Sequence, residues 1–161
     1  MSVISLNTLT KNKIIMNDEI TTLFSFNQFT FNKNLEGISF EDSLRSSDSG
    51  GNCMNWIIGH IVVTRDALLK AIGEEGLCDE NISSLYVKET PFAKDKAADT
   101  SILLDLYAKS QEIINKKFSE TDFKENPEMS KQLAGFGFHE AYHIGQLGIL
   151  RRIIGKSGAI K

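Results

Sequence analysis

The sequence predicts an all-α protein, a four-helix bundle. Four long segments carry apolar residues at three- and four-residue spacing, the period of an amphipathic helix. Only two prolines occur in 161 residues, which leaves room for long helices. No segment has the alternating pattern of a strand. Four amphipathic helices of this length are typical of a bundle.

The first 16 residues differ in composition from the rest. They are rich in Asn, Lys, Ser and Thr, so we expect a flexible leader over 1–16, and Met16 is a candidate alternative start. The first helix is expected over 17–33, with Asn17 as its N-cap. The expected inner face consists of Ile20, Leu23, Phe24, Asn27 and Phe31.

The second helix is expected over 52–72, with Asn52 as its cap and Gly73 as its end. It follows residues 40–52, which are rich in Ser, Gly and Asp and indicate a loop. The expected inward stripe consists of Trp56, Ile57, His60, Val63, Ala67 and Ala71.

Residues 73–98 have poor periodicity and contain Pro91, which indicates a long connection with room for a short helix. This connection is long enough to cross the bundle. The second and third helices would then run parallel, giving an up-down-down-up order rather than a simple meander.

The third helix is expected over 99–118, capped by Asp99 or Thr100. Its expected inner face consists of Leu103, Leu106, Tyr107, Ser110, Ile113 and Ile114. The fourth is expected over 129–154, capped by Ser130 and ended by Gly155. Its expected inner face consists of Leu133, Phe136, His139, His143, Leu147, Leu150 and Ile154. The predicted bundle domain therefore spans 17–155, followed by a C-terminal tail at 156–161.

The composition narrows the class of function. The chain is 41% hydrophobic with a net charge of −3, so its charge favours no nucleic-acid partner. No apolar run reaches the 18 residues that indicate a membrane span, and the start lacks the pattern of a secretory signal. Cys53 and Cys78 are expected to be free, structural thiols in a reducing compartment. These features predict a cytoplasmic protein.

All three histidines of the chain fall on expected inner faces. His139 and His143 are four residues apart, so their rings lie on one helix face. His60 lies in the middle of another helix. A single inward histidine is usually an ordinary core residue, and three core histidines without a metal remain an alternative. However, each would need a hydrogen-bond partner, and these faces offer few. The pattern favours a divalent metal site.

Residues 139–143 also match the H-E-x-x-H pattern of zinc metalloproteases. Such a protease needs a third ligand further along the chain. Only 18 residues follow His143, and none of them is His, Asp or Glu. The supporting sheet of these proteases is also missing from the predicted fold, so the sequence argues against a protease.

Two stretches together resemble the DinB/YfiT-like superfamily. They are WIIGHIVVTRDALL at 56–69 and HEAYHIGQLGILRRIIG at 139–155. Members of that superfamily are mostly bacterial four-helix bundles. A histidine of the second helix and an H-x-x-x-H pair of the last helix bind a divalent metal. The resemblance covers about residues 17–155 and implies that the metal ligands here are His60, His139 and His143.

This chain departs from the family pattern at two positions. Many members have a histidine just before the last ligand and an arginine just after it, where this chain has Tyr142 and Ile144. Neither position is a metal ligand in the pattern, so the expected triad is intact. Any substrate or interface role of those positions is in doubt.

The resemblance implies a metal-dependent enzyme acting on a small molecule. Characterised relatives use low-molecular-weight thiols such as bacillithiol or mycothiol, and many others are regarded as metal-dependent hydrolases. We expect thiol S-transfer, as in detoxification, ahead of hydrolysis, with Zn²⁺, Ni²⁺, Fe²⁺ or Co²⁺ as cofactor. The alternative from another class is a non-catalytic, metal-binding bundle of the stress response, whose fourth coordination position a protein ligand would close.

Other residues are candidates for the surroundings of the metal. Glu140 is a candidate catalytic base that faces the interior, a subunit interface or solvent. Arg151 and Arg152 are either contacts for an acidic thiol or solvated charges that suit a helix C-terminus. A homodimer through the exposed faces of the first and last helices is an expected assembly. The candidates for substrate contact or ligand support are Asn27, Tyr107, Ser110 and Gln146.

Overall fold

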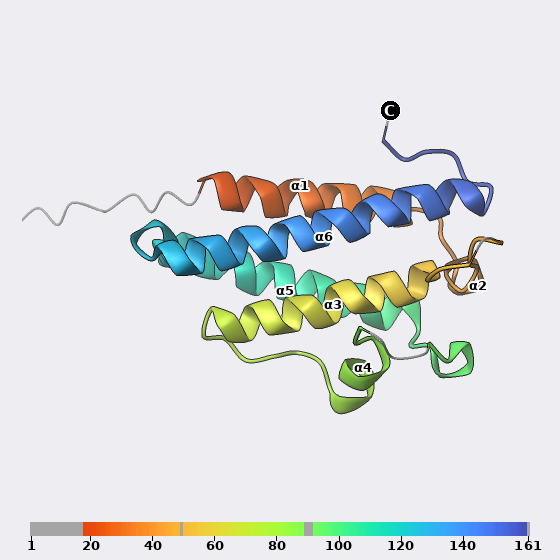
Figure 1. The fold of residues 1–161 in the computed structure, drawn as a ribbon, viewed down its shortest axis with the longest axis horizontal. Helices are drawn as coiled ribbons and strands as arrows, with labels where there is room; N and C mark the ends of the chain where they lie inside the picture. Colours follow the sequence, from red (N-terminus) through yellow and green to blue (C-terminus); the bar gives the residue numbers. More distant parts are fainter. Residues whose placement is uncertain (1–17, 49, 89–91, 161) are drawn as a thin grey trace, which may run out of the picture.

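The computed structural model describes residues 18–48, 50–88 and 92–160. Within these ranges the chain is helical and has no strand. Four long helices lie side by side (Figure 1): α1 (Asp18–Leu35), α3 (Met54–Ala71), α5 (Thr100–Glu120) and α6 (Pro127–Ile153). The short elements are α2 (Phe40–Ser43), α4 (Glu80–Leu85), η1 (Lys94–Lys96) and η2 (Phe123–Glu125). The expected leader at 1–16 and the Asn17 cap lie outside the described residues. None of the described helices has the length and apolar character needed to cross a membrane.

Hydrogen bonds between α1 and α6 show how these two helices lie. Asn27 Nδ2 donates to the Gly137 carbonyl oxygen over 2.9 Å. Asn34, two turns later on α1, donates to the Ile144 carbonyl oxygen, two turns later on α6. The two helices therefore run in the same direction.

Contacts at both ends of α3 and α5 show that these two helices also run in the same direction. Asn55, at the start of α3, donates to the carbonyl oxygen of Ala98, just before α5. Just past the other end of α3, Glu74 pairs with Lys117 in the last turn of α5 at 2.8 Å. The connection between these helices contains α4 and η1, which confirms the short helix expected there.

Two helix starts differ from the prediction. Asn52 is not the cap of α3, because the helix begins at Met54 and Cys53 is its N-cap. Ser130 is not the cap of α6. That helix begins at Pro127, and the Asn126 side chain accepts from the Met129 amide. Proline suits the first position of a helix because its missing N–H has no partner there anyway.

The expected loop at 40–52 begins with a helix. Ser39 and Asp42 form a capping box around α2, each accepting a hydrogen bond from the other's backbone amide. That motif stabilises a helix start. The expected Asp99 cap of α5 is confirmed, because its side chain accepts from the Ser101 amide.

Both helix ends expected at glycine are confirmed. Gly73 has φ +82°, and the following Glu74 amide donates back to the Leu69 carbonyl oxygen at 2.9 Å. Gly155 has φ +87° and is followed by the equivalent bond from Lys156 to Arg151. This pairing satisfies the last carbonyls of a helix and needs a left-handed residue, which glycine adopts without steric cost.

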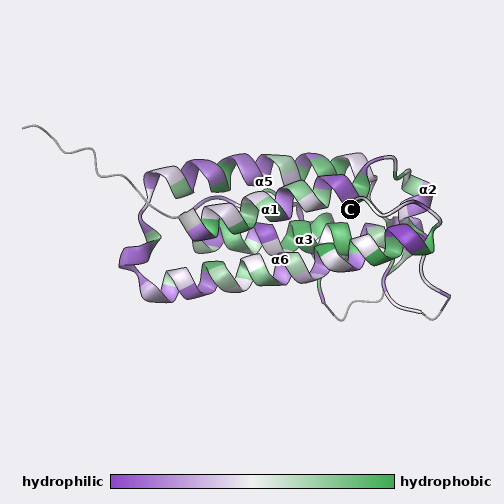
Figure 2. Cartoon of the chain, turned by 90° about the horizontal axis from the view of Figure 1, so that it is seen from above, coloured by the Kyte–Doolittle hydropathy of each residue, from purple (hydrophilic) through white to green (hydrophobic). Residues whose placement is uncertain are grey.

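The core consists of two apolar clusters. One contains Met54, Ile61 and Leu147, and the other contains Leu68, Phe118 and Leu133. On each of α3, α5 and α6, buried polar residues separate the turns that belong to one cluster from the turns that belong to the other. Green, apolar turns of α3 lie between α5 and α6 in Figure 2. The predicted stripe of α3 is partly wrong, because Ala67 is exposed while its neighbours Arg65 and Asp66 are buried.

Candidate metal centre

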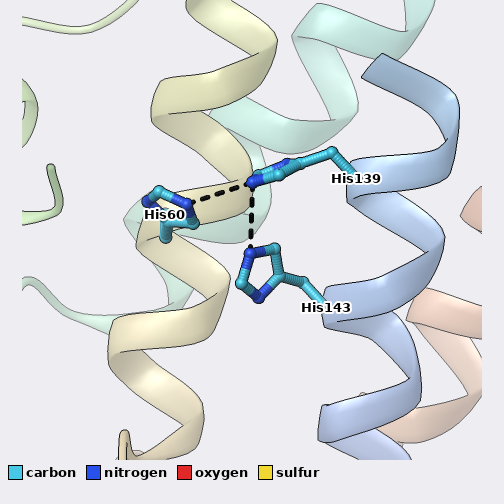
Figure 3. A group of neighbouring side chains, drawn as sticks. All are labelled: His60, His139 and His143. Atoms are coloured by element: carbon cyan, nitrogen blue, oxygen red, sulfur yellow. Dashed lines mark hydrogen bonds between the residues drawn. The ribbon is translucent and has the colours of Figure 1, made fainter. Parts of the chain in front are cut away.

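The three histidines meet between α3 and α6. His139 and His143 lie one turn apart on α6, and His60 faces them from the middle of α3. Figure 3 shows the rings pointing toward one another. The Nε2 atom of His139 lies 3.3 Å from that of His60 and 3.2 Å from that of His143. The potential ligand atoms of all three lie within 4.8 Å of one another.

These separations fit a shared cation. Nitrogen ligands lie about 2.1 Å from Zn²⁺, so two ligands of a tetrahedral site are about 3.4 Å apart. The two Nε2–Nε2 separations from His139, 3.3 and 3.2 Å, are close to that value. The three histidines therefore lie close enough together to hold a metal ion.

The outer nitrogens of two rings have acceptors. Nδ1 of His60 lies 2.9 Å from the Tyr86 carbonyl oxygen, and Nδ1 of His143 lies 2.8 Å from Gln146 Oε1. Each Nδ1 therefore carries the ring proton of the neutral form, which leaves a lone pair on Nε2. Histidine ligands of metals usually have such an acceptor on the outer nitrogen, because it fixes the ring and its tautomer.

His139 shows why the cluster suits a cation. With the other two rings donating through Nδ1, at most one proton is available for the two Nε2–Nε2 contacts, and only if His139 supplies it. At least one contact would then join two lone pairs. Nδ1 of His139 is buried, and it alone among the buried side-chain nitrogens and oxygens of the described residues has no hydrogen-bond partner. A cation shared by the three Nε2 atoms would remove the repulsion.

Burial favours the neutral form of the two α6 histidines. Burial, together with the neighbouring His143 and His60, lowers the pKa of His139 to about 4, and burial is the largest cause. Burial also lowers the pKa of His143, although its bond to Gln146 acts in the opposite sense. Metal ligation requires neutral imidazole, so His139 and His143 are ready to bind at neutral pH.

Aromatic rings and one glycine hold His60 in place. The Trp56 ring stacks on that of His60 with centroids 4.7 Å apart. Tyr86, whose carbonyl fixes Nδ1 of His60, is fully buried against Gly59. A Cβ at Gly59 would overlap the Tyr86 ring. The sequence analysis did not identify Gly59 or Tyr86, because helical periodicity gives no information about a close contact between a helix and a later connection.

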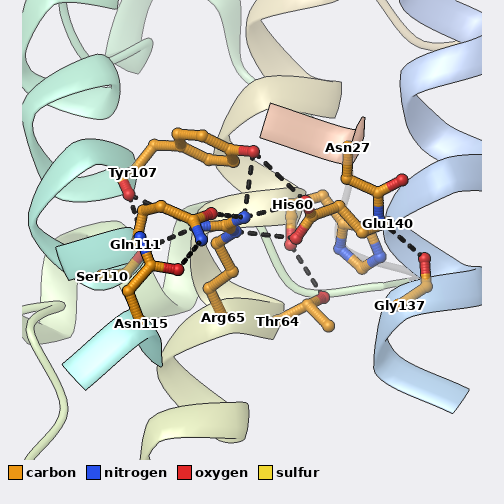
Figure 4. A network of polar contacts seen from close by, with 10 residues as sticks. All are labelled: Asn27, His60, Thr64, Arg65, Tyr107, Ser110, Gln111, Asn115, Gly137 and Glu140. Atoms are coloured by element: carbon orange, nitrogen blue, oxygen red, sulfur yellow. Dashed lines mark hydrogen bonds and ion pairs between the residues drawn. The ribbon is translucent and has the colours of Figure 1, made fainter. Parts of the chain in front are cut away.

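A second cluster surrounds Arg65, a residue to which the sequence analysis gave no role (Figure 4). Arg65 is 1% exposed and Glu140 is 3% exposed, which makes the pair an interior one. Arg65 Nε donates to Glu140 Oε2 at 2.7 Å, and Nη2 donates to Oε1 at 2.9 Å. Two parallel bonds of this kind form a strong, directional ion pair. Glu140 therefore faces the interior rather than solvent, and its carboxylate ties α6 to α3.

Two of the predicted support residues belong to this cluster. Arg65 donates to the Tyr107 hydroxyl and to Ser110 Oγ at 2.9 and 3.1 Å, and its guanidinium lies 3.7 Å from the centre of the Tyr107 ring. Gln111 completes the set at 2.7 Å. Burial and Glu140 raise the pKa of Tyr107, so its hydroxyl stays protonated and donates to Glu140. These contacts leave Tyr107 and Ser110 serving Arg65 rather than the histidines.

The remaining candidates divide between the site and the framework. Gln146 contacts His143, as expected of a ligand support. Asn27 bonds the α6 backbone instead. Arg151 is buried and donates to carbonyl oxygens of Asn34, Glu36 and Ser157, so it is neither a solvated charge nor free for a thiol. Cys53 is buried, and burial raises its thiol pKa.

One surface hollow is lined by a histidine of the cluster, and a second is lined by Gln146, which contacts His143. The first, of about 320 Å³, is lined by His139 itself with Thr64, Gln132, Gly135 and Phe136. The other, of about 370 Å³, is named here the Gln146 groove. Its lining consists of Ser47, Gly51, Asn52, Ile57, Gln146, Ile149, Leu150 and Ile153. Neither described lining contains a charged side chain, so both favour neutral or apolar groups.

Replacing Gln146 by leucine is expected to weaken metal binding about 10- to 100-fold, because the change removes the acceptor that fixes His143. Competition with a chromophoric chelator would measure the affinity. Gln132→Leu, an exposed position on the same helix, is the matched control and should bind as tightly as the unchanged protein. Equal affinities of all three proteins would contradict the role of Gln146.

Comparison with known proteins adds no relative. No family model, curated protein or solved structure matches this chain. The interpretation of the site therefore depends on its geometry and on the two sequence motifs.

Proposed function

We propose that this chain is a metal-dependent enzyme of the DinB type, in which His60, His139 and His143 hold one divalent transition metal. The observation that carries the proposal is the convergence of their three Nε2 atoms, with neighbouring separations of 3.2 and 3.3 Å. Neutral imidazoles suit Zn²⁺, Ni²⁺, Fe²⁺ or Co²⁺. The parallel α1–α6 and α3–α5 pairs support the bundle order up-down-down-up, and a cytoplasmic location is part of the proposal.

The protein leaves room for a further ligand of the metal. Among the described residues, no carboxylate or thiol joins the histidine group. The nearest carboxylate along the chain, that of Glu140, is held by Arg65 instead. A structural site is normally closed by four protein ligands, whereas a catalytic site has three and an open position. This difference favours an enzyme over a non-catalytic metal-binding bundle.

The proposed reaction is S-transfer, in which the thiolate of a low-molecular-weight thiol reacts with an electrophilic small molecule. Hydrolysis of a small molecule is the second possibility. A bound divalent metal lowers the pKa of the water or thiol that takes its open position. Tyr86 and Gln146 fix two of the ligand rings. Thr64 and Phe136 line the hollow beside His139, where a neutral or apolar part of the substrate would lie.

Glu140 has no direct part in this proposal. Both of its carboxylate oxygens accept hydrogen bonds from Arg65, and one also accepts from Tyr107. A general base must reach the proton that it removes, and this carboxylate is engaged within the core. We therefore assign it a role in holding α6 against α3.

Elemental analysis of the purified, untagged protein beside His139→Ala tests the metal. We expect about one transition metal per chain and its loss in the variant. The Co²⁺ form is then titrated with a small thiol. A sulfur-to-cobalt absorption band supports thiol chemistry, and its absence together with ester hydrolysis supports a hydrolase. If no metal is found or taken up from added Zn²⁺ or Ni²⁺, the histidines are core residues and the proposal fails.

A further inference from the structure

A hollow continues the candidate metal centre along α3 and α6. Thr64 lies one turn after His60 on α3, and Gly135 lies one turn before His139 on α6. Both line the hollow of about 320 Å³ that also contains His139, and we call it the His139 hollow. It therefore extends from the histidine cluster by one helical turn, about 5.4 Å.

Gly135 leaves this hollow open. It lies within α6, although glycine is a poor helix former. A Cβ at this position would meet nothing within 4 Å, so no packing contact requires glycine there. Gly137 differs, because its Cβ would overlap Leu23 of α1. Gly145 resembles Gly135 in meeting nothing, and it too lines a hollow, one between α1 and α6. Because Gly135 lines the His139 hollow, a side chain at this position would take up part of it.

The lining of the His139 hollow selects an uncharged, apolar group. Phe136 and Gly135 are apolar, and the hydroxyl of Thr64 already donates to the His60 carbonyl oxygen. The described lining contains no charged side chain, so a charged group would lie there without a partner, which is unfavourable. A cavity of about 150 Å³ can hold benzene, so the hollow has room for a substituted ring. Its volume is at the lower end of the range for small-molecule pockets, about 300–1,000 Å³.

The Gln146 groove differs in character from the His139 hollow. Its lining contains the polar, uncharged side chains of Ser47, Asn52 and Gln146 beside apolar ones. On α3 it includes Ile57, about one turn before His60, and on α6 it includes Gln146, which contacts His143. The two concavities therefore flank the histidine cluster, one toward each end of α3 and α6. One is apolar, and the other offers hydrogen-bonding groups.

We propose that the His139 hollow is the subsite of the electrophile, and that the electrophile is an uncharged aromatic or branched-alkyl molecule of about one ring. This inference rests on the proposed S-transfer and names the class of its second substrate. Gly135 limits the size of the group that fits, and the polar body of the thiol lies toward the Gln146 groove. The thiolate sulfur forms a bond to a carbon of the electrophile, and the bond from that carbon to its leaving group breaks. The leaving group departs with the electron pair, and the thiol proton passes to water.

Nuclear magnetic resonance of the metal-depleted protein tests the hollow itself, with benzyl alcohol as the uncharged probe. We expect the amide signals of Gln132 and Phe136 to shift on titration. In Gly135→Leu the dissociation constant should rise by about tenfold or more, because the leucine side chain occupies the hollow. Ala134→Leu is the matched control and should bind as the unchanged protein does, since Ala134 is exposed on the same helix and is not a lining residue. Phenylacetate, which adds a negative charge to the ring, should bind about tenfold more weakly or worse.

Gly135→Ala tests whether the fold itself needs glycine at this position. Alanine is the better helix former, and its methyl group meets open space. We expect the Tm of the metal-depleted protein to rise by about 2–4 °C, measured by calorimetry. A lower Tm would show a structural need for Gly135 and overturn the proposal. An unchanged affinity for benzyl alcohol in Gly135→Leu, or phenylacetate binding as tight as that of benzyl alcohol, would overturn it as well.

Two thiols added to the Co²⁺ form test whether the hollow serves the metal. Benzyl mercaptan carries both a sulfur and an apolar ring, so it stands for the sulfur and the group transferred to it, whereas 2-mercaptoethanol carries a small polar group instead. From the sulfur-to-cobalt band we expect benzyl mercaptan to bind about tenfold tighter, with this advantage lost in Gly135→Leu and retained in Ala134→Leu. If cobalt binds and the two thiols bind equally, the electrophile subsite lies elsewhere and only this inference fails. If no cobalt binds, the proposed function fails and the electrophile subsite fails with it.

Discussion

Replacing Arg65 by methionine is expected to lower the free energy of unfolding by about 3–5 kcal/mol, because the change leaves the Glu140 carboxylate buried without its cation. Of the carboxylate's described partners, the Tyr107 hydroxyl at 3.2 Å would remain. A domain of this kind is stable by only about 5–15 kcal/mol. The loss would therefore be a large fraction of the total stability, and urea unfolding followed by circular dichroism would measure it.

Two further variants separate the ion pair from general damage. In Arg65→Met/Glu140→Leu both charges are gone, and apolar replacements of a buried pair are often neutral, so the double variant should regain much of the lost stability. Lys109 and Asp105 form an exposed ion pair on α5, and Lys109→Met should change stability little. A double variant less stable than Arg65→Met would contradict a penalty that arises from an unpaired buried charge.

Zinc is expected to stabilise the metal-depleted protein, and His60→Ala is expected to abolish the effect. A ligand at 100 times its dissociation constant adds about 2.7 kcal/mol to the stability of the state that binds it. For a chain of 161 residues this is a rise of about 5–10 °C in Tm. Without His60 the site retains two ligands on one helix, and α3 is no longer joined to α6 through the metal.

Differential scanning calorimetry with and without Zn²⁺ measures this shift. Thr64→Val is the matched control, because Thr64 lies one turn from His60 and bonds its carbonyl oxygen without being a ligand. Its metal-free Tm will differ from that of the unchanged protein, but the rise with Zn²⁺ should be the same. A full rise in His60→Ala would show that zinc binds elsewhere on the chain.

The histidine cluster could be predicted from the sequence because helical spacing is a local property. His139 and His143 share a face at any position of the helix in the fold, and apolar neighbours indicated that this face is buried. The helix ends at Gly73 and Gly155 were predictable for the same reason. The missed start of α6 had a local signal too, since Asn126-Pro127 matches a cap followed by proline at the first helical position. Ser39 and Asp42 likewise signalled the missed α2.

Arg65 could not be predicted in this way. α3 is buried on most of its circumference, because every residue from Met54 to Val62 except the half-buried His60 is buried. Periodicity therefore does not define one inward stripe. The partner Glu140 lies 75 residues away, and nothing local indicates which turn of α6 meets which turn of α3. The contact of Tyr86 with His60 could not be predicted either. Tyr86 lies in the connection after α3 and contacts His60 through its backbone carbonyl, which any residue type could supply.

The polar layer around Arg65 has a consequence for how α3 and α6 can slide past each other. Two apolar helices can often interdigitate equally well after a shift of one turn, about 5.4 Å. Here such a shift would take the guanidinium away from its carboxylate and set an unpaired charge against apolar neighbours. The same shift would separate His60 from His139 and His143, since each ring moves with its helix. The ion pair thus excludes the misaligned packings, and the alignment that remains is the one in which the three imidazoles meet.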